Sequence, residues 1–169
     1  WSSDVCSSDL PLPLLDERLF LIGRPDLAGM PATASAKLSQ LGELPLILPS
    51  DSHGLRAQLT AAFRRARYQP SIVAEVDGLA LLMDYVREGL GATIQPGAAL
   101  GRLQDAPLAS VPVAESYATR PNLIVSLSDD ELSPAGLAAR VVLADVAQQL
   151  VRAGHWPGAR LRQPGVHKK

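Results

Sequence analysis

Residues 45–96 read PLILPSDSHGLRAQLTAAFRRARYQPSIVAEVDGLALLMDYVREGLGATIQP, and short apolar runs alternate here with longer amphipathic ones. The short runs suit buried strands and are too short for helices. The longer runs place their apolar residues at the spacing of one helix face. Strands that alternate with helices in this way predict an α/β domain with a mainly parallel sheet.

Proline, glycine and capping residues set the boundaries of these elements. Within the stretch we predict strands at 45–49, 71–76 and 91–95, and helices at 51–66 and 79–88. Asp51 and Ser52 are the expected N-caps of the first helix. Its arginines, including Arg56, are expected mostly on faces other than the apolar one.

The same signals extend outward from this stretch. They predict strands at 18–23, 108–113 and 122–127, a helical turn at 37–41 and a short helix at 98–103. Ser133 followed by Pro134 is typical of a helix start. A broad apolar stripe then predicts the longest helix of the chain, which continues to Gly154.

The two ends differ in character from the rest. Residues 1–10 read WSSDVCSSDL, without helical or strand periodicity, and we interpret them as a non-native leader that includes Cys6. Residues 155–169 are rich in Pro, Gly and basic side chains and predict a disordered basic tail.

The composition excludes several classes of protein. Lys plus Arg number 16 and Asp plus Glu 17, so the net charge of -1 argues against a dedicated nucleic-acid-binding domain. One cysteine excludes a disulfide framework and a Cys-rich zinc site within the chain. We see no apolar run of membrane-spanning length and no secretory signal, so we expect a cytoplasmic protein without a membrane partner.

No catalytic motif stands out. Asp51, Ser52 and His53 are consecutive, which cannot give the linear order of a nucleophile, base and carboxylate. Gly89 and Gly91 follow a helix and precede a strand, the reverse of a dinucleotide-binding motif. The histidines lack metal-ligand spacing. We therefore predict no enzyme activity, no cofactor and no metal site.

One polar loop is a candidate binding site. The segment Ser50-Asp51-Ser52-His53-Gly54 follows a strand and leads into a helix. Backbone N–H groups at a helix start, with hydroxyl and imidazole side chains, suit an anionic or polar ligand at the carboxyl end of a strand. The alternative interpretation is an ordinary capped helix.

The ordered set of motifs resembles the C-terminal effector-binding region of a LysR-type transcriptional regulator, in the nitrogen-assimilation-control-like branch. The motifs are Arg18–Gly23, the stretch from PLILPSDSHG to GATIQP, and the last helix with its Ser-Pro start. The resemblance implies a fold like type-two periplasmic binding proteins, with two α/β lobes, here one complete lobe and part of the other. It assigns 11–23 to the end of the first lobe and a crossover strand, 24–117 to the second lobe, and 118–154 to the return crossover and C-terminal helix of the first lobe.

The resemblance also implies effector contacts, position by position. They would be Ser50, Ser52, His53, Gly54, Asp77, Gly78, Gln95 and Pro96. Gln95 stands where the family often has an apolar residue. The implied partners are a small-molecule effector, a second copy in a homodimer or homotetramer, and DNA, the last through an N-terminal domain that this sequence lacks.

Three functions remain as hypotheses. The leading one is the ligand-sensing domain of a bacterial transcription factor. The alternative is a solute-binding protein of a transporter with the same two-lobe fold. A third is an enzyme on this architecture, such as an aromatic amino-acid dehydratase or a porphobilinogen-deaminase-like protein, because a fold alone does not decide function.

Overall fold

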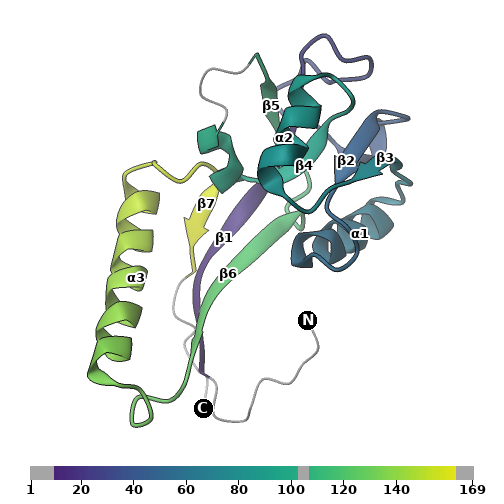
Figure 1. The fold of residues 1–169 in the computed structure, drawn as a ribbon. Coiled ribbons are helices and arrows are strands. Elements are labelled where there is room, and N and C mark those ends of the chain that lie inside the picture. Colours follow the sequence, from purple (N-terminus) through teal and green to yellow (C-terminus); the bar gives the residue numbers. More distant parts are fainter. Residues whose placement is uncertain (1–9, 103–106, 163–169) are drawn as a thin grey trace. The chain divides into compact units, whose positions relative to one another are not determined.

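A computed structural model describes residues 10–102 and 107–162 (Figure 1). The chain divides into two compact units. Unit 1 comprises Trp1–Glu17 and Pro121–Lys169, and unit 2 comprises Arg18–Arg120. The chain passes between the units within two strands, β1 (Leu10–Gly23) and β6 (Thr119–Ser126). Within the described residues, no helix has the length and apolar character that crossing a bilayer requires.

The sheet of unit 2 combines parallel and antiparallel pairs. Strand β2 (Pro45–Leu48) runs parallel to β3 (Ser71–Glu75). Two backbone hydrogen bonds of 2.8 Å join β2 to Ala92, which directly precedes β4 (Thr93–Pro96). The C-terminal half of β1 pairs antiparallel with β4 on one side and with β5 (Ala109–Pro112) on the other. The groups β3-β2 and β4-β1-β5 are thus joined through the bridge at Ala92, which gives the overall order β3-β2-β4-β1-β5.

The prediction of a mainly parallel sheet is therefore wrong for β1, which is antiparallel to both of its neighbours in unit 2. The prediction assumed that each strand reaches the sheet through a crossover helix, which makes neighbouring strands parallel. Strand β1 instead enters unit 2 directly from unit 1, so no crossover sets its direction. It also begins at Leu10, well before the predicted start at Arg18.

Helices cover both faces of this sheet. Strand side chains alternate between the faces, so Leu46 packs with Leu55 and Leu59 of helix α1 (Gly54–Ala66). Its neighbour Ile47 packs on the other face with the buried side chains of α2 (Leu79–Arg87). Both cores consist mainly of Leu, Ile, Val and Ala, as the scarcity of aromatic residues requires.

The remaining helical segments follow their sequence signals. Residues 38–40 form a single 3-10 turn, and the short helix expected at 98–103 is a 3-10 helix, Gly97–Arg102. Helix α3 (Pro134–Arg152) begins as predicted, because the Ser133 side chain accepts a hydrogen bond from the Gly136 N–H at 3.1 Å.

In unit 1, a third strand pairs with β1 where the sequence predicted a disordered tail. Strand β7 (Ala159–Leu161) runs antiparallel to β1, with Leu15 opposite Leu161. Trp156 donates its indole N–H to Glu17 at 2.5 Å, and Arg162 donates to Asp16 at 2.8 Å. The prediction is thus wrong for residues 155–162, because partners distant in sequence hold a segment whose composition resembles a flexible tail.

Two of the sequence predictions concern the ends of the chain. Residues 163–169 of the predicted tail and 1–9 of the predicted leader lie outside the described residues, and Leu10 is the first residue of β1. The predicted lobe boundaries after residues 23 and 117 lie near the unit boundaries after Glu17 and Arg120. The division into lobes stays a prediction.

Candidate functional site

A pocket of about 280 Å³ lies in unit 2, at the carboxyl ends of β2, β3 and β4. This is the edge at which open α/β sheets bind ligands. Its lining residues are Pro49, His53, Leu55, Asp77, Leu79, Leu82, Gln95, Pro96, Ala98, Ala99 and Arg120. Apolar walls with a few polar groups are typical of small-molecule sites.

The structure brings four of the predicted site residues together around this pocket. They are His53, Asp77, Gln95 and Pro96. The other four are not among the lining residues: Ser50, Ser52, Gly54 and Gly78. The assignment of all eight residues as effector contacts stays a prediction.

Ser50 and Asp77 bind each other. The Ser50 backbone N–H donates to Asp77 Oδ1 at 2.9 Å, and the Ser50 hydroxyl donates to Asp77 Oδ2 at 2.9 Å. Ser52 lies within hydrogen-bond distance of the same hydroxyl, with 2.8 Å between the two Oγ atoms. The Ser50 backbone N–H, and after it the Ser50 hydroxyl, lower the pKa of Asp77. Asp77 is therefore ionised at neutral pH.

His53, and neither Asp51 nor Ser52, is the N-cap of α1. Its Nδ1 accepts a hydrogen bond from the Leu55 backbone N–H at 3.2 Å. The predicted caps were wrong because the helix begins at Gly54. His53 therefore occupies the N-cap position, with an extended backbone, directly before the first turn. A neutral imidazole that accepts at Nδ1 carries its proton on Nε2. His53 thus has a second nitrogen that can donate to a ligand.

Gln95 lines the pocket and is buried, with 4% of its surface exposed. It lies in β4, opposite Phe20 of β1, and its Nε2 donates to Thr93 Oγ1 at 3.0 Å. A buried carboxamide needs hydrogen-bond partners. A polar side chain is thus accommodated where the resemblance led us to expect an apolar one.

The two predicted glycines begin helices. Gly54 is the first residue of α1, and Gly78 is the N-cap of α2. Neither needs the left-handed backbone conformation, and a Cβ at either position would meet nothing within 4 Å. Any contact with a ligand would therefore come from their backbone, and their lack of a side chain is not a requirement of the fold.

Sequence reasoning missed two arginines. Arg56 is 8% exposed, although we expected the arginines of α1 mostly on faces other than the apolar one. Arg120 lines the pocket from β6, but the resemblance assigned residues 118–154 to the other lobe. One signal for Arg56 was present: Glu75 at the end of the next strand offers it a carboxylate partner.

This arrangement suits binding. The pocket offers a guanidinium, an ionised carboxylate, an imidazole and a carboxamide within apolar walls. Among residues 10–102 and 107–162, no three His, Cys, Asp or Glu side chains gather in a way that could hold a metal ion. A small molecule with several polar groups is the ligand that such a lining fits best.

Comparisons with known proteins agree with this geometry. The model of the LysR substrate binding domain matches residues 12–150. Over 145 residues the chain is 30% identical to the nitrogen assimilation regulatory protein nac of Klebsiella aerogenes, a match that covers 81% of this chain and 44% of that protein. The chain thus spans less than half the length of this curated relative.

Solved structures with the same fold include the effector binding domain of QuiR in complex with shikimate. Its TM-score is 0.73 at 20% identity, covering 86% of this chain and 68% of that one. An OxyR C206 mutant of Corynebacterium glutamicum has a TM-score of 0.68 at 26% identity, covering 86% of this chain and 46% of that one. At 20% identity, the likeness to QuiR shows the fold alone. The expected periplasmic-binding-protein-like α/β fold is confirmed.

Proposed function

Because the chain belongs to the LysR substrate-binding domain family, we propose that it is the effector-sensing part of a transcriptional regulator that responds to a small polar metabolite. The observation that carries the proposal is the pocket of unit 2, where His53, Asp77 and Gln95 meet at the carboxyl ends of three neighbouring strands.

The curated relatives favour this function over the alternatives from the sequence. The matched relatives are a nitrogen assimilation regulator and a regulator with a helix-turn-helix domain, BbuR of Bordetella bronchiseptica. This favours a regulator over the solute-binding protein of a transporter. A role without enzyme activity stays part of the proposal.

We propose that ligand binding acts on the whole regulator through the two strands that connect the units. A ligand shifts a conformational equilibrium only if it binds one state better than the other. Arg120 both lines the pocket and is the last residue of unit 2, in the strand that continues into unit 1. The parent protein would bind DNA through a separate domain in the cytoplasm and assemble as a homodimer or homotetramer.

The experiment is a ligand screen on the 169-residue chain, first by thermal shift and then by calorimetry, with shikimate as the first probe and other small hydroxylated or aminated acids after it. A ligand at about 100 times its Kd stabilises a protein by about 2.7 kcal/mol. We expect the active ligand to bind His53→Ala and Gln95→Ala at least tenfold more weakly. Arg64→Ala, at an exposed site on α1, is the matched control. Full affinity in both pocket variants would contradict this site.

A further inference from the structure

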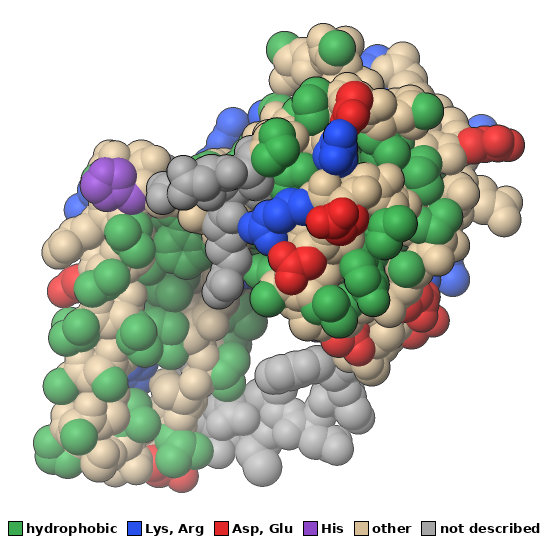
Figure 2. Space-filling model, turned by 45° about the horizontal axis from the view of Figure 1, so that its top comes forward, with side chains coloured by type: hydrophobic (Ala, Val, Ile, Leu, Met, Phe, Trp, Pro, Cys, Tyr) green, Lys and Arg blue, Asp and Glu red, His purple; other side chains and the backbone are tan. Residues whose placement is uncertain are grey.

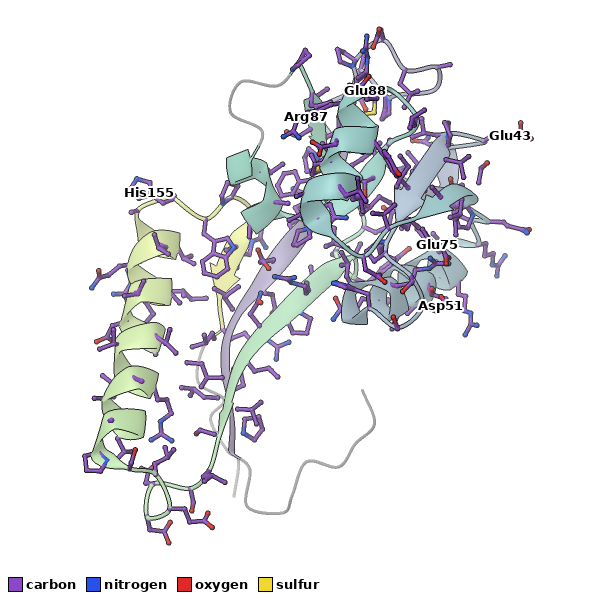
Figure 3. All side chains as sticks on the ribbon, viewed as in Figure 1. Glu43, Asp51, Glu75, Arg87, Glu88 and His155 are labelled. Carbon is purple, nitrogen blue, oxygen red and sulfur yellow. The ribbon has the colours of Figure 1, made fainter. Side chains whose placement is uncertain are left out.

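The buried arginine of α1 holds two strand ends together. Arg56 Nη1 donates to the Pro49 carbonyl oxygen at 2.8 Å and to Glu75 Oε1 at 2.7 Å. Its Nε also lies 3.5 Å from Asp51 Oδ1, but Asp51 is highly exposed, so this pair contributes little. Figure 3 labels Glu75 and Asp51, both beside α1. Arg56 thus bridges the end of β2 and the end of β3.

A second bridge joins the same two chain segments. Asp77 follows β3 by two residues and accepts both Ser50 hydrogen bonds, while Glu75 in β3 accepts from Arg56. The loop from Pro49 to His53 is therefore held at its first residue by Arg56 and at its second by Asp77. We call residues 49–53 the cradle loop.

The cradle loop ends in His53, which lines the pocket. Its His53 N–H donates to the Ser50 carbonyl oxygen at 3.0 Å, and its imidazole caps α1 through Nδ1. This cap leaves Nε2 as the nitrogen that can donate into the pocket. Anything that frees Pro49 or Ser50 removes the support on which the orientation of that imidazole depends.

We propose that Arg56 is a positioning residue for ligand recognition: it holds the cradle loop against β3, and so fixes His53 as the N-cap of α1 with its Nε2–H directed to the ligand. Buried charges are kept only when they are paired, and Arg56 takes both of its close partners from the cradle loop and β3. Ser50 and Asp77 form a separate bridge, between the cradle loop and the segment that follows β3. The inference rests on the proposed function, but its first test needs no ligand.

That test compares the full chain with Arg56→Met, which keeps an unbranched apolar stem at this position and removes the hydrogen-bond donors. Arg64→Met, at an exposed site on the same helix, is the matched control. NMR hydrogen exchange is measured at the His53 and Leu55 amides of the cradle loop and α1, and at the Ile47 amide of β2 as an internal reference. The tautomer of His53 is read from its imidazole nitrogen shifts.

We expect Arg56→Met to speed exchange of the His53 and Leu55 amides by about tenfold, in line with the loss of hydrogen bonds from a charged group. Exchange at Ile47 should change by less than about twofold, and the Nδ1–H tautomer of His53, which the hydrogen bond from Leu55 excludes, should become detectable. Arg56→Lys should give an intermediate result, because an ammonium retains the charge without the forked geometry. Arg64→Met should match the unmodified chain.

Two results would overturn the proposal. One is unchanged loop exchange and an unchanged His53 tautomer in folded Arg56→Met. The other is equal acceleration at all three amides, which would show a merely structural role. If Arg56→Met does not fold, Glu75→Ala removes the β3 end of the Arg56 bridge instead. We then expect faster exchange at the His53 amide, and an unchanged rate there would also overturn the proposal.

Ligand binding separates this proposal from the proposed function. A ligand that binds the unmodified chain should bind Arg56→Met about tenfold more weakly and Arg64→Met equally well. If no probe binds the unmodified chain, the proposed function fails while the exchange and tautomer results still decide the role of Arg56. If a probe binds with full affinity to Arg56→Met, the positioning role fails and the proposed function stands.

Discussion

A single imidazole caps α1 and lines the pocket. His53 accepts from the Leu55 N–H through Nδ1, and the same side chain belongs to the pocket lining. Most N-caps are Ser, Thr, Asp or Asn, whose side chains are shorter than that of histidine. A histidine at this position can serve the helix with one nitrogen and a ligand with the other.

Removal of this cap should lower the stability of the fold. We expect His53→Ala to lower the free energy of unfolding by about 1 kcal/mol, the usual contribution of a capping side chain. His53→Asn should retain most of the stability, because Asn also accepts at the N-cap, while ligand affinity still falls. Urea unfolding of the two variants measures the difference. Equal loss in both would show that the Leu55 N–H gains nothing from a side-chain acceptor.

Ser50 and Asp77 predict a specific dependence on pH. The bonds from Ser50 lower the pKa of Asp77 below its ordinary value of 3.8. The stability that this carboxylate contributes is therefore fully present above pH 3.8 and is lost as the pH falls through the lower folded-state pKa.

Ser50→Ala tests this linkage. Without the hydroxyl donor, the pKa of Asp77 should rise toward 3.8, and the dependence of unfolding on pH below 4 should become shallower. A carboxyl NMR titration of Asp77 in both proteins measures the shift. An unchanged pKa would mean that the Ser50 backbone N–H alone accounts for the effect.

At the scale of elements, the approach of β2 to the start of β4 depends on one glycine. A Cβ at Gly91 would lie 2.8 Å from the Pro45 carbonyl oxygen and 3.1 Å from Ile47 Cγ1. Real Cβ atoms do not tolerate the shorter distance, so the two strands would have to separate. The two 2.8 Å hydrogen bonds that Ala92 makes with β2 would then lengthen.

We therefore expect Gly91→Ala to destabilise unit 2 by about 1–3 kcal/mol, the usual cost of forcing extra volume into a packed site. Gly54→Ala is the matched control, because a Cβ there meets nothing and the backbone is not left-handed. It should be neutral or slightly stabilising, since Ala favours a helix over Gly. Thermal unfolding of both variants checks the prediction, and equal stability would contradict the close approach.

At the scale of the whole molecule, α3 differs from α1 and α2 in how little of its apolar surface is buried. Only Ala147 of this helix is buried, whereas Val141, Val142 and Leu143 are each more than half exposed. Figure 2 shows hydrophobic side chains along this helix, at the left of that view. Complete burial of a large aliphatic side chain is worth about 1.5–3 kcal/mol, and these three gain less than half of it. We therefore expect α3 to be held less firmly than the helices of unit 2.

We expect hydrogen exchange to be faster in α3 than in the strands of unit 2, and the isolated chain to self-associate as its concentration rises. Val142→Lys combined with Leu143→Lys should suppress the association, because both sites are exposed in the single chain. Sedimentation velocity and exchange measurements decide this. A monodisperse monomer with strong protection throughout 134–152 would contradict the expectation.

Local spacing in the sequence determined much of this molecule. The alternation of strands and helices from Pro45 to Pro96, the Ser133 cap and the polar loop after β2 all follow from residues within a few positions of one another. The family resemblance needed no more than the order of these pieces, and the comparisons confirm it. Four of the predicted site residues lie together because parallel strands bring their carboxyl ends to one edge.

Only the tertiary structure decided what each polar residue does there. Arg56 meets Glu75 across 19 positions of sequence, and Ser50 meets Asp77 across 27. Local sequence signals likewise do not determine the antiparallel direction of β1 or the pairing of β7 with it. Helix and strand preferences depend on near neighbours, whereas these contacts depend on which strand ends the sheet places side by side, a choice that the packed core makes as a whole.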